Sequence, residues 1–122
     1  MREGSSIGFI VQAHGILGLI VGVVAVIRAV WIFGRGRWPA DRLISGLFTG
    51  LIDLQALLGI IRLFGKLPTG SAWLHPVLMI VAVVLAHMGA ARLGTDPRPG
   101  SSGAWMTWGA FILIIVGISL VL

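Results

Sequence analysis

Four long runs of apolar residues alternate with three short polar breaks along the chain. Each run has about 20 residues or more, the length that an α-helix needs to cross the hydrocarbon core of a bilayer. The breaks hold four of the five prolines and several glycines, which is typical of loops. The breaks cover residues 34–42, 65–73 and 94–103. The pattern predicts helices over residues 7–33, 43–64, 74–93 and 104–122.

Connections this short favour antiparallel packing of consecutive helices. We therefore expect an all-α integral membrane protein: one domain over residues 1–122, with four transmembrane helices in an up-down-up-down antiparallel bundle. Pro76 suits the first position of the third helix. The first apolar run is longer than the core of a cleavable signal and no small-residue cleavage site follows it.

Composition strengthens the membrane interpretation. Hydrophobic residues make up 57% of the 122 residues and charged residues only 11%, with a mean hydropathy of +1.04. A soluble domain carries about 25% charged residues, and a chain this short cannot bury so much apolar surface in its own core. The absence of cysteine excludes disulfides, thiolate metal sites and cysteine nucleophiles.

The net charge of +5 does not indicate nucleic-acid binding, because the basic residues flank the apolar runs as topology signals do. Six of them fall at the side reached after the first and third helices, namely Arg28, Arg35, Arg37, Arg42, Arg92 and Arg98. Three fall at the other side, namely Arg2, Arg62 and Lys66. The positive-inside rule then places both termini outside a bacterial cytoplasmic membrane. The first helix, at 27 residues, could tilt, or Arg28 could snorkel to the inner surface. Tryptophans such as Trp31 and Trp38 are expected to anchor the interface.

Few polar side chains interrupt the apolar runs, and each one needs a partner in hydrocarbon. They are Gln12, His14, Asp53, Gln55, His75 and His87. Counted from the inner arginines at about 1.5 Å per residue, His14 and His75 differ by about 5 Å in depth and lie in the outer half. By the same count His87 lies in the inner half.

Helical periodicity adds the faces of these residues. His14 shares its face with Gly18 and Val21, and Gln55 shares its face with Ile52, Gly59 and Arg62. His75 heads a stripe of Met79, Ala82, Ala86 and Gly89. Asp53 and Gln55 lie about 200° apart on the helical wheel, so one site does not easily use both.

Two histidines at similar depth on non-adjacent helices can ligate a haem iron from both sides, and the small residues leave room for a flat macrocycle. This interpretation makes His14 and His75 the metal ligands, with His87 as the less favoured ligand, and Gln55, Asp53 and Met79 as further cofactor-binding residues. Each residue also has an ordinary role. His14 could hydrogen-bond across helices, His75 could be solvated, and His87 and Met79 could pack. Asp53 could bond to His14 or to a backbone carbonyl, and its functional alternative to supporting a histidine ligand is a proton site.

The strings AHGILGLI, DLQALLGI and LHPVLMIVAVVLAHMG resemble a family of small bacterial four-helix membrane proteins. The arrangement is similar to that of four-helix membrane-bound b-type cytochromes. The resemblance implies that His14, Gln55, His75 and Met79 are the matching positions. With three histidines in all, the chain has ligands for one haem, held by two histidines or by a histidine and a methionine, and not for two haems with paired histidines.

Three functions are compatible with these features. The first is electron transfer through one haem b, or a chlorophyll-type tetrapyrrole as a variant, with a quinone or an outer electron carrier as the partner. The second is a non-catalytic accessory subunit of a larger respiratory or photosynthetic complex. The third is an oligomeric proton or small-solute pathway around Asp53, His14 and His87. An enzyme is less expected, because the chain has no HExxH, no phosphate-binding loop and no Ser–His–Asp set at one depth.

Overall fold

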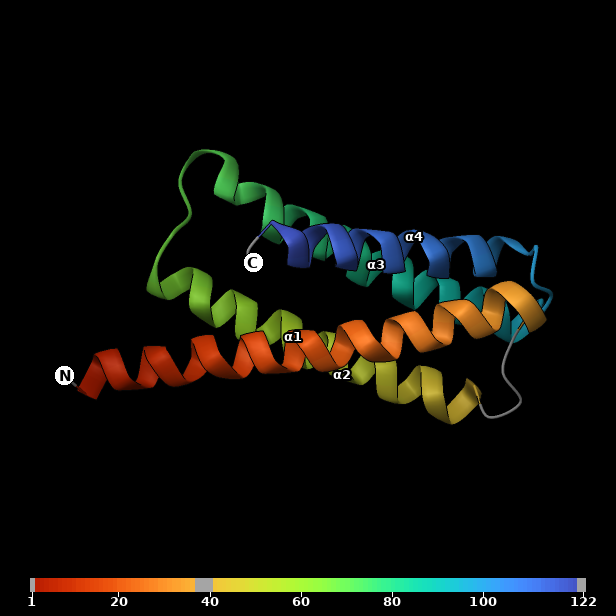
Figure 1. Ribbon diagram of the computed structural model, residues 1–122, viewed down its shortest axis with the longest axis horizontal. Coiled ribbons are helices and arrows are strands. Elements are labelled where there is room, and N and C mark those ends of the chain that lie inside the picture. The colour runs from red at the N-terminus through yellow and green to blue at the C-terminus, as the bar shows by residue number, and fades with distance from the viewer. Residues whose placement is uncertain (1, 37–40, 121–122) are drawn as a thin grey trace.

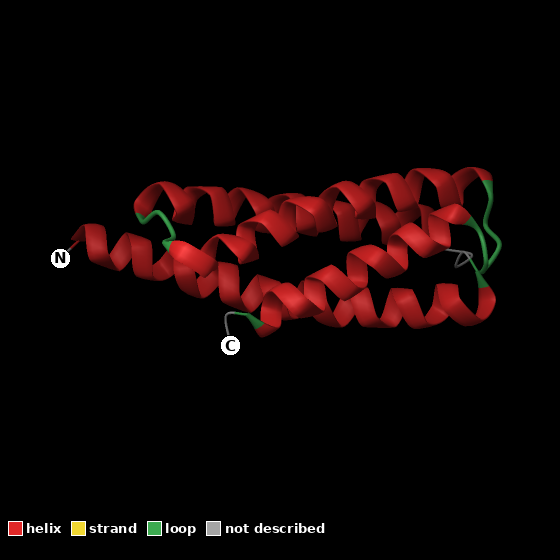
Figure 2. Ribbon diagram, turned by 90° about the horizontal axis from the view of Figure 1, so that it is seen from above, coloured by secondary structure: helices red, strands yellow, loops and turns green. Residues whose placement is uncertain are grey.

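The computed structural model describes residues 2–36 and 41–120. Within these ranges it contains four long helices, one short 3₁₀ helix and no strand (Figure 2). The helices are α1 (Arg2–Arg35), α2 (Asp41–Gly65), α3 (Leu74–Thr95) and α4 (Ser102–Ser119), and the 3₁₀ helix η1 (Gly70–Trp73) leads directly into α3. The chain is therefore all-α, as the sequence predicts.

The four long helices form a bundle in which each helix contacts two neighbours. α1 packs on α2 and α4, and α3 packs on α2 and α4, so α1 and α3 lie on one diagonal. Figure 1 shows the first turn of α1, the end of α2, the start of α3 and the end of α4 toward one end of the bundle. We call this end the histidine end, because it contains His14 and His75.

The helix boundaries differ from the prediction by a few residues. α1 begins at Arg2 rather than residue 7, because no proline interrupts the polar residues before the first apolar run. α3 begins at Leu74, and Pro76 lies in its first turn, where a missing N–H costs nothing. α4 begins at Ser102, because the Ser101 side chain caps it by accepting from the Ala104 N–H at 3.3 Å. Arg37, Trp38 and residues 121–122 lie outside the described residues.

The core contains many small side chains, and this allows α3 and α4 to pack closely. A Cβ atom added at Gly89 would lie 2.6 Å from Thr107 Oγ1, and one added at Gly103 would lie 2.6 Å from the Leu93 backbone nitrogen. Ala82 and Ala86 on α3 and Ala110 on α4 are also buried. The stripe that the sequence predicts on the third helix is therefore the face that meets α4.

Outside this core, large apolar side chains cover the outer faces of all four helices. Leu19, Leu57, Ile80 and Ile112 are each about half exposed, one on each helix. Each helix is long and apolar enough to cross a membrane.

Arg28 corrects one expectation. It is buried, with only 1% of its surface exposed, and its guanidinium carbon lies 5.6 Å from the centre of the Phe48 ring on α2. It does not snorkel to the surface, because α1 continues for seven residues beyond it to Arg35 and an aromatic face is available inside the bundle.

Candidate functional site: a histidine cavity between the four helices

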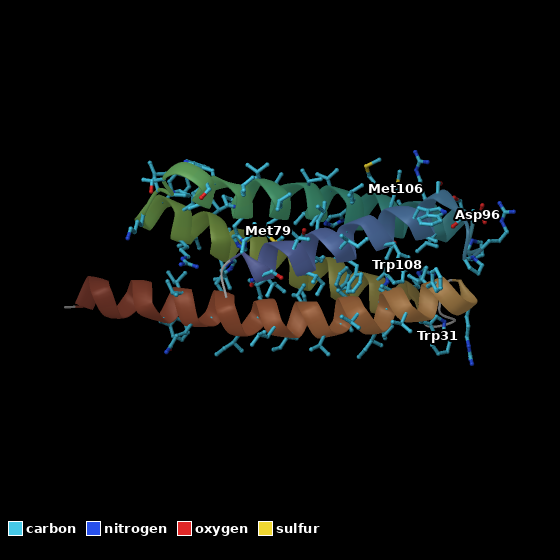
Figure 3. The ribbon with its side chains drawn as sticks, turned by 45° about the horizontal axis from the view of Figure 1, so that its top comes forward. Trp31, Met79, Asp96, Met106 and Trp108 are labelled. Atoms are coloured by element: carbon cyan, nitrogen blue, oxygen red, sulfur yellow. The ribbon has the colours of Figure 1, made fainter. Side chains whose placement is uncertain are left out.

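A cavity of about 490 Å³ lies inside the histidine end of the bundle. All four helices contribute to its wall, as does the segment that joins α2 to α3. The wall is mainly apolar, and its polar side chains include those of His14, Gln55 and His75. Figure 3 places Met79, another wall residue, nearer this end and Asp96 at the opposite end. The volume falls within the range of about 300–1,000 Å³ that is usual for small-molecule sites.

His14 lies where α1 and α2 approach each other, and two glycines make that approach possible. A Cβ atom at Gly59 would lie 3.2 Å from His14 Cε1, and one at Gly18 would lie 3.0 Å from Gln55 Nε2. Gln55 donates a hydrogen bond of 2.7 Å from Nε2 to the backbone oxygen of His14. The α2 helix therefore holds the turn of α1 that carries His14.

His75 is fixed by a contact with α4. It lies in the first turn of α3, and its Nδ1–H donates to the backbone oxygen of Gly117 on α4 over 2.8 Å. A carbonyl oxygen only accepts, so the proton of a neutral ring is on Nδ1 and the lone pair is on Nε2. Gly117 lies in the last turn of α4, near the end of the helix. The contact therefore gives the Gly117 carbonyl a hydrogen-bond donor and sets the tautomer of His75.

The two rings meet across the bundle although their helices do not pack on each other. The centres of the His14 and His75 rings are 6.2 Å apart, and the ring planes are perpendicular. The similar depth that the sequence predicts for these histidines agrees with this geometry. Within the described residues, His14 Nδ1 and Gln55 Oε1 are buried without a hydrogen-bond partner. Two residues that line the cavity therefore each carry a buried polar atom without a partner among the described residues.

Two further parts of the cavity are relevant to a ligand. Met79 follows His75 by one turn and lines the wall, where its sulfur packs beside Gly117 of α4. Arg62 and Lys66 line the part of the wall near the end of α2, and both are exposed. The open side of an apolar cavity is thus positively charged.

Asp53 and His87 are not part of this cavity. They pair with each other on the outer surface between α2 and α3, with His87 Nε2 donating to Asp53 Oδ1 at 2.8 Å. The structure therefore does not bring Asp53 to His14, nor does it gather Asp53, His14 and His87 into one pathway. The sequence contains a signal for this pair. Asp53 and His87 each lie 17 residues from Gly70, in the segment between α2 and α3, so they occupy matching positions along the two helices.

A metal ion held by protein ligands alone does not match the side chains of the described residues. Among the described residues, no three His, Cys, Asp or Glu side chains gather as a metal-binding group. The cavity offers a pair of imidazoles, which suits a metal that brings its other ligands in a macrocycle. Comparison with known proteins gives no further guidance, since no family model, curated protein or solved structure matches this chain.

Proposed function

We propose that this chain is a four-span antiparallel membrane protein that binds one haem b between α1 and α3 and transfers electrons. The observation that carries the proposal is the separation of 6.2 Å between the His14 and His75 ring centres inside a cavity. The two imidazoles come from helices that do not pack on each other, and both would hold the metal of one tetrapyrrole, which would supply one-electron redox chemistry.

The surrounding residues fit a tetrapyrrole. Gly18, Gly59 and Ala82 keep the wall free of bulk beside the histidines. Arg62 and Lys66 supply cations at the side where the carboxylate groups of a haem would meet water. The hydrogen bond from His75 Nδ1 to Gly117 leaves Nε2 as the ligand atom and orients the ring.

The residues of this chain have separate roles in that function. His14 and His75 would hold the group, and its iron would supply one-electron redox chemistry. Gln55 holds the α1 backbone at His14, which keeps the two rings in register. The apolar wall excludes water and so tunes the reduction potential. A quinone or an outer carrier would exchange electrons at this end.

The membrane part of the proposal is supported by the four apolar helices and by the apolar side chains on the outer faces. The basic residues favour a topology with both termini outside a bacterial cytoplasmic membrane. Since the chain has no cysteine, single cysteines introduced at Thr69 and Gly100 can be labelled with an impermeant maleimide in intact cells. Thr69→Cys should label from outside, and Gly100→Cys only after the membrane is opened. Labelling of both or neither in intact cells would contradict the topology.

The function is tested by the visible spectrum of the purified protein, before and after reduction with dithionite. We expect a Soret band and sharp α and β bands, which His14→Ala and His75→Ala each abolish or shift. His87→Ala is the matched control, because that ring lies outside the cavity and should leave the spectrum unchanged. A spectrum with a red band and extractable magnesium would indicate a chlorophyll-type pigment instead. A colourless protein after haem supplementation would contradict the proposal.

A further inference from the structure

The outer face of α2 and α3 carries a polar pair where the proposed membrane placement puts lipid. Asp53 lies at the centre of the candidate span Arg42–Gly65. The side chains of His87 and Asp53 are 46% and 56% exposed, although they are bonded to each other. Polar groups in contact with hydrocarbon are costly and normally face protein or water.

The pair has unused hydrogen-bonding capacity. Asp53 Oδ1 accepts from His87 Nε2, while Asp53 Oδ2 and His87 Nδ1 have no partner among the described residues. When His87 carries both ring protons, the pair has one free acceptor, Asp53 Oδ2, and one free donor, His87 Nδ1. These are complementary to the same two groups on an identical surface.

The exposed residues around the pair have the same spacing on α2 and on α3. On α2 the exposed residues Gly46, Gly50, Asp53 and Leu57 follow one another by four, three and four positions. On α3 the exposed residues Ile80, Val84, His87 and Ala91 have the same spacing. A Cβ atom added at Gly46 or Gly50 would meet nothing within 4 Å, so this part of α2 is open to a neighbouring helix. Small residues four apart allow helices to approach closely in a membrane.

We propose that this face binds a second copy of the chain, forming a two-fold dimer in the membrane. The proposal uses the membrane placement given above and does not depend on haem. Both copies insert in the same orientation, so the two-fold axis follows the membrane normal. That axis sets α2 of one copy against α3 of the other. Asp53 Oδ2 then accepts from His87 Nδ1 of the second copy, and the reciprocal bond closes a four-residue network.

The test is disulfide cross-linking in native membranes, with two tagged chains that each carry one introduced cysteine. A chain with Leu57→Cys should cross-link to a co-expressed chain with Val84→Cys, because these positions flank the polar network on facing helices. The control replaces Val84→Cys with Ile112→Cys on α4, which is about equally exposed but lies on another face. Gly50→Leu should lower the cross-linked fraction about fivefold or more, as should Asp53→Leu with His87→Leu.

Gly15→Leu is the matched control for Gly50→Leu, because both glycines are exposed helical positions with open space around the added side chain. Cross-linking that is no stronger than in the Ile112→Cys control, that survives Gly50→Leu and the double variant, or that joins the chain to a different protein would overturn the dimer. Alkaline extraction of the same membranes checks the membrane placement, and the visible spectrum checks haem. Failure of the dimer is thus distinguishable from failure of the proposed function.

Discussion

The His14–His75 pair and the His87–Asp53 pair both contain histidine, but they differ in location and in hydrogen bonding. The first pair lies inside the bundle, and the His14 ring keeps a buried nitrogen without a hydrogen-bond partner. The second lies on the outer face, where histidine and carboxylate satisfy each other at 2.8 Å. A buried nitrogen with a free lone pair is a cost to folding unless a ligand uses it. An exposed ion pair in hydrocarbon is a cost unless protein covers it. The inner pair is therefore the candidate for binding a ligand, and the outer pair is the candidate for contact with another protein surface.

The largest expected effect comes from a substitution that crowds the His14–His75 pair without replacing either histidine. Gly59→Leu inserts a side chain where a Cβ atom alone would already lie 3.2 Å from His14 Cε1. The substitution should abolish tetrapyrrole binding and destabilise the bundle by about 1–3 kcal/mol through overpacking. The Soret absorbance per protein is the measurement. Gly50→Leu on the same helix is the control and should retain full absorbance, because its side chain enters open space.

A smaller effect is expected from releasing the α1 backbone at His14. Gln55→Leu removes the hydrogen bond from Nε2 to the His14 oxygen, a loss of about 0.5–1.5 kcal/mol. Haem affinity should fall about two- to tenfold, measured by titration of haem into the apoprotein in detergent. Gln12→Leu is the control, because Gln12 is exposed on α1 and lies outside the cavity. Equal affinities of the two variants would show that Gln55 does not position His14.

The outer pair should contribute to stability but not to pigment binding. A double-mutant cycle with Asp53→Leu, His87→Leu and the double variant should give a coupling energy of about 0.6–2 kcal/mol, the range for interhelical hydrogen bonds in membranes. The measurement is unfolding in detergent, with the Soret band recorded for each variant. Loss of the Soret band in the single variants would connect the two pairs and remove the contrast between them.

A third pair, Asp96 and Arg98, is also joined by hydrogen bonds to a carboxylate, and the smallest effect is expected there. The carboxyl of Asp96, in the connection between α3 and α4, accepts from Arg98 Nε and Nη2, and this holds its pKa at about 2, below the ordinary value of 3.8. A depressed acid pKa contributes stability that is present above about pH 4 and is lost as the pH falls toward 2. In Arg98→Gln the pKa of Asp96 should rise from about 2 toward 3.8, because the side-chain hydrogen bonds are lost while the bond from the backbone N–H of residue 98 remains. The measurement is NMR titration of the carboxyl carbon. A pKa that stays near 2 would exclude Arg98 as the cause.

The positions of the four helices, and the face of its helix on which each residue lies, can be predicted from the sequence alone. Apolar runs of membrane-spanning length fixed the four helices, because hydropathy depends only on composition along the chain. Helical periodicity placed His14 with Gly18 and placed Gln55 with Gly59 and Arg62, and all five residues line one cavity. Residue counting set His14 and His75 at similar depth, in agreement with rings that meet.

Which helix faces pack against each other could be learned only from the packed bundle. Periodicity fixes the positions of side chains around one helix, but the tilt and rotation of that helix depend on the side chains packed against it. For this reason Asp53 bonds to His87 rather than His14, and Arg28 is buried beside Phe48 rather than at the surface. The bond from His75 to the Gly117 carbonyl was likewise beyond the sequence, because a backbone acceptor has no residue signature. The last turn of α4 provides that acceptor, and only the packing of α3 on α4 brings it within 2.8 Å of the His75 ring.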